Sequence, residues 1–125
     1  MVHCSKNDSQ IIKVPITGKW NLNIDSIYTS GIAGPKIEVY HGISTDYWDF
    51  RVDGKLYIQE GTLLDTLNFN ILTDSTMFID SFGTIINGQA QASSILSCSR
   101  HQAIIRSAIL PTPDGIYIRT IFLVR

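Results

Sequence analysis

The sequence predicts a small all-β domain, built either as a sandwich or as a barrel. Apolar and polar residues alternate along many short segments, which is the pattern of half-buried antiparallel strands. β-Branched and aromatic residues are abundant, as strands prefer, and turn residues separate the segments. The chain has 125 residues, of which 44% are hydrophobic and 17% are charged. One domain of this size can bury a core, and disorder is not expected.

Nine segments carry the strand pattern, and Lys36–His41 is a weaker tenth. A short helix could lie in Ser26–Pro35 or Asn87–Ser94, but neither would be a main element. Many short strands with so little helix are typical of a sandwich or a barrel. In chain order, the predicted strands are Trp20–Tyr28, Asp46–Val52, Lys55–Glu60, Asp65–Leu72, Thr76–Ser81, Thr84–Asn87, Ser94–Cys98, Gln102–Leu110 and Ile116–Val124.

A hairpin is predicted around Gly54. A two-residue turn would mix apolar and polar side chains on each face of the two strands. A three-residue loop, Val52–Gly54, instead pairs Phe50 with Leu56 and keeps the apolar residues on one face. Because register follows the buried face, we predict the three-residue loop, with Gly54 in the left-handed conformation of a bulge.

Charge and composition argue against several functions. The formal net charge is −1 and the basic residues are scattered, whereas nucleic-acid binding needs a basic patch. No run of eighteen apolar residues is present, so no transmembrane helix is expected. The histidines and cysteines lack metal-ligand spacing, and the glycines form no phosphate-binding loop. We therefore expect neither a metal nor a cofactor.

Catalytic signals are weak, and we expect no enzymatic activity. The segment Ser97–His101 combines serine, cysteine and histidine, but neighbours on a strand point to opposite faces and do not form a triad. Three acidic residues, Asp46, Asp49 and Asp53, lie close together in the sequence. Asp49 is predicted to face solvent, however, and Asp53 lies in a turn. Nothing in the sequence places two carboxyl groups in one cleft, as acid–base catalysis requires.

Residues 1–14 predict a polar leader or tether ahead of a β-domain that spans residues 15–125. Cys4 is followed by small, charged and polar residues up to Ser9, which resembles the mature start of a bacterial lipoprotein. That resemblance implies lipid attachment at Cys4 and a place in the cell envelope, periplasmic or at the outer membrane. A cytoplasmic protein with a polar tail is the alternative. The two cysteines, Cys4 and Cys98, permit one disulfide, and free or buried thiols are the simplest interpretation.

Three features together point to a known family. Gly18-Lys19-Trp20 opens the first predicted strand, a hairpin follows a long first loop, and Arg125 closes the last strand. These features resemble the lipocalin-like β-barrel family, in particular the small bacterial lipocalin-like domains. The resemblance implies an eight-stranded antiparallel up-and-down barrel. The avidin family begins similarly, but its biotin site needs late tryptophans that this chain lacks.

The resemblance also places Trp20 at the closed end of the barrel, with Arg125 over its ring. Barrel geometry agrees, because the last strand of a closed up-and-down barrel pairs antiparallel with the first. We therefore expect a guanidinium–indole contact between Arg125 and Trp20, which is worth about 0.5–2 kcal/mol.

Apolar residues that face inward carry the functional hypothesis. In a carrier or sensor they would line a cup for one small hydrophobic ligand. Alternatively they fill the barrel, which then serves as a protein-interaction module, such as an inhibitor or envelope component. Thr29–Thr45 is the expected rim loop. Tyr47, Tyr57 and Tyr117 are expected to face outward, as a partner surface or as cross-strand pairs. The interior candidates are Leu22, Ile24, Trp48, Phe50, Leu56, Ile58, Leu67, Phe69, Ile71, Met77, Ile79, Ile118 and Phe122.

Overall fold

The structure is a computed structural model that describes residues 3–4, 14–83, 85–86, 88–113 and 115–125. Within these residues there are strands, turns and loops, and no helix. Most of the expected leader, residues 5–13, lies outside the described residues, as do Thr84 and Asn87 of one predicted strand. The strands are β1 (His3–Cys4), β2 (Val14–Pro15), β3 (Gly18–Ser30), β4 (Lys36–His41), β5 (Tyr47–Phe50), β6 (Lys55–Glu60), β7 (Leu63–Ile71), β8 (Thr76–Ile79), β9 (Ile85–Ile86), β10 (Gln89–Ala90), β11 (Ser93–Cys98), β12 (Gln102–Arg106), β13 (Leu110–Thr112) and β14 (Gly115–Val124).

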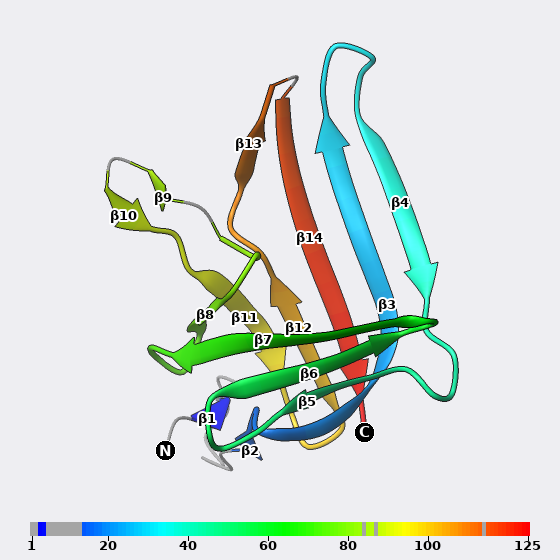
Figure 1. The fold of residues 1–125 in the computed structure, drawn as a ribbon, viewed down its shortest axis with the longest axis vertical. Coiled ribbons are helices and arrows are strands. Elements are labelled where there is room, and N and C mark those ends of the chain that lie inside the picture. The colour runs from blue at the N-terminus through cyan, green and yellow to red at the C-terminus, as the bar shows by residue number, and fades with distance from the viewer. Residues whose placement is uncertain (1–2, 5–13, 84, 87, 114) are drawn as a thin grey trace.

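Eight strands form a closed antiparallel barrel (Figure 1). Around the barrel the order is β3, β5, β6, β7, β8, β11, β12 and β14, and β14 pairs back to β3. Barrel strands that are neighbours in space also follow one another along the chain, so the barrel runs up and down, as predicted. Closure matters because it leaves these eight strands without the unpaired edges that invite aggregation.

Two further strands extend one end of the barrel. β3 pairs with β5 through Gly18–Asn21 and with β4 through Ile24–Thr29. β14 pairs with β12 through Thr120–Val124 and with β13 through Gly115–Tyr117. The strands β4, β3, β14 and β13 therefore form a sheet that projects beyond β5, β6 and β7, as Figure 1 shows. The weakly predicted strand at Lys36–His41 is confirmed as β4.

Side chains fill the interior of the barrel. The largest of them, Trp20, Trp48, Phe50 and Phe82, are at most 2% exposed. Most of the predicted interior residues belong to this core: Leu22, Trp48, Phe50, Leu56, Ile58, Met77 and Ile79 are buried in it, and Leu67, Phe69 and Ile71 pack against it. The core also contains residues that were not predicted to face the interior, namely Ile16, Phe82, Ile95, Cys98, Ala103, Ile105, Ile121 and Leu123.

The prediction that Ile24 faces the interior is wrong, because β3 contains a bulge at Asn23. Leu22 and Ile24 pair with consecutive residues of β14, and Asn23 is the extra residue between them. A bulge adds one residue to one strand and shifts the alternation of faces by one position. Asp25 is therefore turned inward and is 4% exposed, whereas Ile24 lies half-buried on the outer face.

The last strand also buries the face opposite to the predicted one. Ile121 and Leu123 are fully buried, while Ile118 and Phe122, which were predicted to face inward, lie half-buried on the outer face. Both faces of β14 are apolar here, so period-two alternation does not identify the face that meets the core. The inward face continues through Arg119, which lies two residues before Ile121.

The hairpin at Gly54 has the predicted register and loop. Phe50 lies opposite Leu56, and the Arg51 N–H donates to the carbonyl of Lys55 at 2.8 Å. Gly54 has a φ of +87°, and its N–H donates to the Arg51 carbonyl at 3.1 Å. This combination is a three-residue loop with a bulge, and glycine adopts the left-handed conformation without steric cost.

Trp20 and Arg125 meet at one end of the barrel, as predicted. The guanidinium carbon of Arg125 lies 3.7 Å from the centroid of the Trp20 ring. Trp20 is fully buried, and its Nε1–H donates to the Ile16 carbonyl at 2.7 Å. Arg125 also donates from Nη1 to the Thr17 carbonyl at 3.2 Å and from Nη2 to the Pro15 carbonyl at 3.1 Å. The guanidinium therefore covers the indole and joins the last strand to the segment before β3.

Gly18 leaves room for this contact. Its φ is +114°, and a Cβ atom at this position would lie 2.9 Å from Nη1 of Arg125. A side chain here would therefore adopt an unfavourable backbone conformation and would displace the Arg125 guanidinium from its position. The glycine of the Gly18-Lys19-Trp20 motif is thus part of the barrel closure.

We expect Arg125→Ala to lower the free energy of unfolding by about 1–2 kcal/mol, because it removes the contact with Trp20 and the hydrogen bonds to two carbonyls. Urea denaturation followed by tryptophan fluorescence measures this loss. Arg106→Ala is the matched control, because Arg106 is an exposed arginine on β12. Equal losses in the two variants would contradict the closing role of Arg125.

Candidate functional site

A cavity of about 450 Å³, which we call the mouth cavity, lies at the end of the barrel opposite Trp20 and Arg125. It opens between the projecting sheet and the ends of β6 and β7. Its lining combines charged, aromatic and aliphatic side chains, a mixture that suits binding of a small molecule. The lining residues are Asp25, Ile27, Glu38, Val39, Tyr40, Glu60, Leu63, Tyr117 and Arg119.

The floor of the mouth cavity is an ion cluster of Asp25, Arg119 and Glu60. Arg119 donates hydrogen bonds to Asp25 from two nitrogens, from Nη2 to Oδ2 and from Nε to Oδ1 at 2.9 Å. The Nη2 of Arg119 also donates to Oε2 of Glu60 at 3.0 Å. Below the cluster, the guanidinium carbon lies 4.7 Å from the Phe82 ring centroid, and the Nε1–H of Trp48 donates to Glu60 at 3.3 Å. The cluster therefore separates the apolar core from the mouth.

Burial raises the pKa of the Glu60 carboxyl from its ordinary value of 4.5 to about 7. The side chain is only 9% exposed, and a carboxylate that leaves water loses hydration. The neighbouring Asp25 raises this pKa further, whereas Arg119 and the Trp48 N–H act in the opposite direction. Glu60 therefore changes its charge near neutral pH.

Asp46 fixes one wall of the mouth cavity. This carboxylate is fully buried and accepts hydrogen bonds from the Tyr40 hydroxyl at 2.6 Å, the Ile43 N–H at 3.0 Å and the Gly61 N–H at 2.8 Å. Burial alone would raise the pKa of Asp46, but these bonds outweigh it and hold the pKa below its ordinary value. The bond to Asp46 in turn raises the pKa of Tyr40 to about 12. Asp46 thus positions Tyr40 as a neutral phenol on the cavity.

The structure corrects the expectation that no two carboxyl groups share a cleft. Asp25 and Glu60 both contact Arg119, although they come from β3 and β6. The predicted inward positions of Ile24 and Ile118 implied that their neighbours Asp25 and Arg119 face solvent, and the bulge in β3 and the burial of the other face of β14 reverse both. A charged residue inside an apolar strand, such as Arg119, is the one signal that could have indicated the cluster.

The outward tyrosines divide into two groups. Tyr47 and Tyr57 lie on the outer face as predicted, where Lys19 lies 4.5 Å from the Tyr47 ring centroid and Arg51 lies 4.8 Å from that of Tyr57. For these two tyrosines the contacts therefore support cross-strand pairing, the alternative to a partner surface. Tyr117 was also predicted to face outward, but it shares the inward face of Arg119 and lines the mouth cavity.

The predicted apolar cup is occupied by the core itself. None of the predicted interior residues lines the mouth cavity, which lies above them. The expected rim, Thr29–Thr45, contributes Glu38, Val39 and Tyr40 to the lining through β4. The lining at this end therefore comes mainly from side chains of the projecting sheet.

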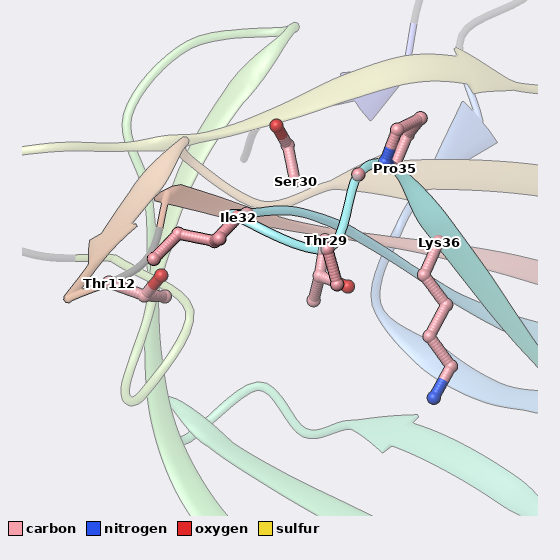
Figure 2. A pocket seen from close by; sticks show the side chains of 9 residues that line it. Thr29, Ser30, Ile32, Pro35, Lys36 and Thr112 are labelled. Atoms are coloured by element: carbon pink, nitrogen blue, oxygen red, sulfur yellow. The ribbon is translucent and has the colours of Figure 1, made fainter.

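A larger hollow, of about 720 Å³, lies at the tip of the projecting sheet, around the turn between β3 and β4. Figure 2 shows the side chains of Ile32 and Thr112 on one side of this hollow and that of Lys36 on the other. Ile32 is 93% exposed, and Lys36 is engaged by Glu38 at 2.7 Å. The hollow has no buried charged group to orient a ligand, so the mouth cavity is the better site.

Other chemistry is not apparent in the described part of the chain. No group of three His, Cys, Asp or Glu residues there is arranged to hold a metal ion. The described residues that line the mouth cavity include no serine, cysteine or histidine to act as a nucleophile. A search of the same residues for a helix long and apolar enough to cross a membrane found none.

The interpretation of Cys98 as a free thiol is wrong, because Cys98 is disulfide-bonded. The sequence holds one other cysteine, Cys4, and the strand β1 that contains it contacts β11, which ends at Cys98. The side chain of Cys4 lies outside what the structure describes, so lipid attachment there stays an expectation.

Comparison with known proteins adds no relative. No family model, no curated protein and no solved structure matches the chain. The closed eight-stranded barrel with two extra strands is consistent with the lipocalin-like architecture, and family membership stays a proposal. Function is therefore inferred from the geometry of the mouth cavity.

We expect the free energy of unfolding to fall by about 1–3 kcal/mol as the pH rises from about 4.5 to about 7. The reason is that folded Glu60 keeps a proton that the unfolded chain has already released. Glu60→Gln removes this titration and should flatten the profile, as measured by urea denaturation across the interval. Glu38→Gln, which alters an exposed acid of the same cavity, should keep the wild-type slope. The assignment fails if Glu60→Gln also keeps that slope.

Proposed function

We propose that this protein is a non-enzymatic carrier or sensor that binds a small amphipathic molecule at the mouth of a filled barrel. The observation that carries the proposal is the cavity of about 450 Å³, which has apolar walls above a charged floor. Ligand sites of several hundred Å³ typically combine apolar walls with a few polar groups that fix orientation. The interior is packed with large side chains, which argues against a ligand held deep inside the barrel.

The walls and the floor have separate roles in this proposal. Ile27, Val39 and Leu63 offer apolar surface to the tail of a ligand. Arg119 and Glu60 lie beneath them, with exposed fractions of 22% and 9% for their side chains, and can pair with a polar head. A molecule with both an apolar and a polar part therefore fits better than a purely apolar one.

A second function, as a protein-interaction module, is favoured by the strand β4. All six of its residues are exposed, and Ile37 is 65% exposed. β4 ends the sheet, so its outer edge offers backbone groups to an added strand. In this alternative the filled barrel is a scaffold and the mouth cavity is structural.

The mouth site can be tested with three eight-carbon probes, octylamine, octanol and octanoate, added to isotope-labelled protein. We expect at least one probe to shift the Nε1–H signal of Trp48 and the Nε–H signal of Arg119 in a saturable way. The Nε1–H signal of Trp20, at the closed end, should stay unchanged and serves as an internal control. If no probe moves the Trp48 and Arg119 signals, the mouth-binding proposal is wrong and the module is favoured.

Two leucines of β7 offer a matched pair of variants. Leu63 lines the cavity, whereas Leu64 is the next residue and points to the opposite face. We expect Leu63→Ala to weaken binding of the best probe by about three- to tenfold, because apolar contact is lost, and Leu64→Ala to leave it unchanged. Equal effects in the two variants would mean that the probes bind elsewhere.

We also propose that the protein is exported to the cell envelope, because disulfides such as that of Cys98 persist mainly in oxidising compartments. A sulfur that carries a lipid cannot form a disulfide, so pairing between the two cysteines would exclude lipid attachment at Cys4. We expect the intact mass of protein purified from its own source to rise by two hydrogen atoms on reduction. A mass increased by a lipid group would instead support the anchor.

A further inference from the structure

We propose that the mouth cavity selects cations, and that its ligand is a small alkylammonium compound whose charged head pairs with Glu60. This inference rests on the proposed function and specifies the chemical class of its ligand. It follows from the balance of charge in the lining, from the geometry of Arg119 and from the aromatic rings at the rim.

The charge balance of the lining is negative. Three carboxylic acids, Asp25, Glu38 and Glu60, face the cavity with a single guanidinium, that of Arg119. Glu38 is neutralised by Lys36 at 2.7 Å on the exposed strand β4. The two remaining acids share Arg119, so one positive charge stands against two carboxyl groups. A cationic ligand would complete this balance, whereas an anionic one would increase the repulsion.

Arg119 is directed mainly to one of the two acids. It holds Asp25 through two nitrogens, and it reaches Glu60 with Nη2 alone. The Glu60 carboxyl also accepts a hydrogen bond from the neutral Trp48 indole and shares a side-chain hydrogen bond with Asp25. Glu60 is therefore the acid with the weaker ionic partner, and an ammonium group at the floor of the cavity would supply the missing charge.

The titration of Glu60 supports this geometry. The titratable and charged groups that line the cavity with Glu60 or contact its lining are Asp25 on β3, Lys36, Glu38 and Tyr40 on β4, Asp46 in the loop before β5, and Tyr117 and Arg119 on β14. On β7, Asp65 lies on the same face as Leu63, two residues farther along the strand. No histidine occurs among the described residues that line the cavity. With a pKa of about 7, Glu60 carries a proton in much of the unliganded protein, and a bound cation would displace that proton.

The walls suit the rest of an alkylammonium ligand. Tyr40 and Tyr117 line the cavity beside the acids, and tyrosine rings attract ammonium groups through their faces. Tyr40 stays a neutral phenol because its hydroxyl donates to Asp46 at 2.6 Å. Ile27, Val39 and Leu63 then provide the apolar surface for the alkyl chain.

The inference predicts a coupling between binding and pH. An alkylamine stays protonated across neutral pH, as lysine does. Glu60 is ionised in about one molecule in ten at pH 6 and in about nine in ten at pH 8, for a pKa of about 7. Octylamine should therefore bind about tenfold more tightly at pH 8 than at pH 6, and binding should release about half a proton at pH 7 and close to one proton at pH 6. Octanol should show neither effect.

Isothermal calorimetry tests this with the same three probes, in buffers of different ionisation enthalpy so that released protons are counted. We expect wild-type protein at pH 8 to prefer octylamine over octanol by about tenfold or more, and octanoate to bind least. Glu60→Gln should lose the preference and the proton release while still binding octanol. Asp49→Asn is the control, because it removes an acid on the outer face of β5. This variant should retain both the preference for octylamine and the proton release.

The outcomes separate this inference from the proposal on which it rests. If octanol or octanoate binds the mouth as well as octylamine, the site stands and cation selection is wrong. A pH-independent affinity for octylamine, or a preference retained in Glu60→Gln, also overturns the inference. If none of the probes binds, the proposed function fails and cation selection fails with it. The proton count on wild-type protein needs no variant, so the test holds even if Glu60→Gln does not fold.

Discussion

The antiparallel ladder between β3 and β14 is the constraint on which the rest of the structure depends. It runs from Asn21 paired with Val124 to Ser30 paired with Ile116, and it joins the first barrel strand to the last. At one end of the ladder, Arg125 reaches Trp20 and closes the barrel. Further along, the same ladder sets Arg119 beside Asp25. One strand pairing therefore positions both the closed end and the floor of the mouth.

The bulge at Asn23 gives the two halves of β3 different tasks. Before it, Trp20 and Leu22 face inward and build the apolar core. After it, the inward face carries Asp25, so a carboxylate replaces the next apolar side chain. Bulges often re-aim a side chain near a functional site. Here the extra residue divides β3 into a core strand and a following segment that lines the mouth cavity.

The ion cluster of Asp25, Glu60 and Arg119 is expected to add little to the stability of the fold. Removing charged groups from water costs several kcal/mol per ion, and a buried ion pair often adds little net stability. The pKa of Glu60, raised to about 7, reflects this loss of hydration. Proteins tend to break local rules of packing at functional sites. An acid with a raised pKa at the floor of an open cavity supports the proposed ligand site, and the filled core beneath it argues against a ligand held deeper in the barrel.

Local patterns in the sequence determined much of the fold. The alternation along β5 and β6 and the glycine at position 54 were enough to predict the hairpin register, because one face of those strands is apolar and the other is polar. The barrel closure by Trp20 and Arg125 followed once a family resemblance supplied the architecture. Tertiary structure decided the rest. The inward face of β14 could not be predicted from the sequence, because both faces of this strand are apolar. The cluster of Asp25, Glu60 and Arg119 draws on strands far apart in the chain. Their meeting depends on a one-residue bulge and on burial against the other strands, and no local pattern records either.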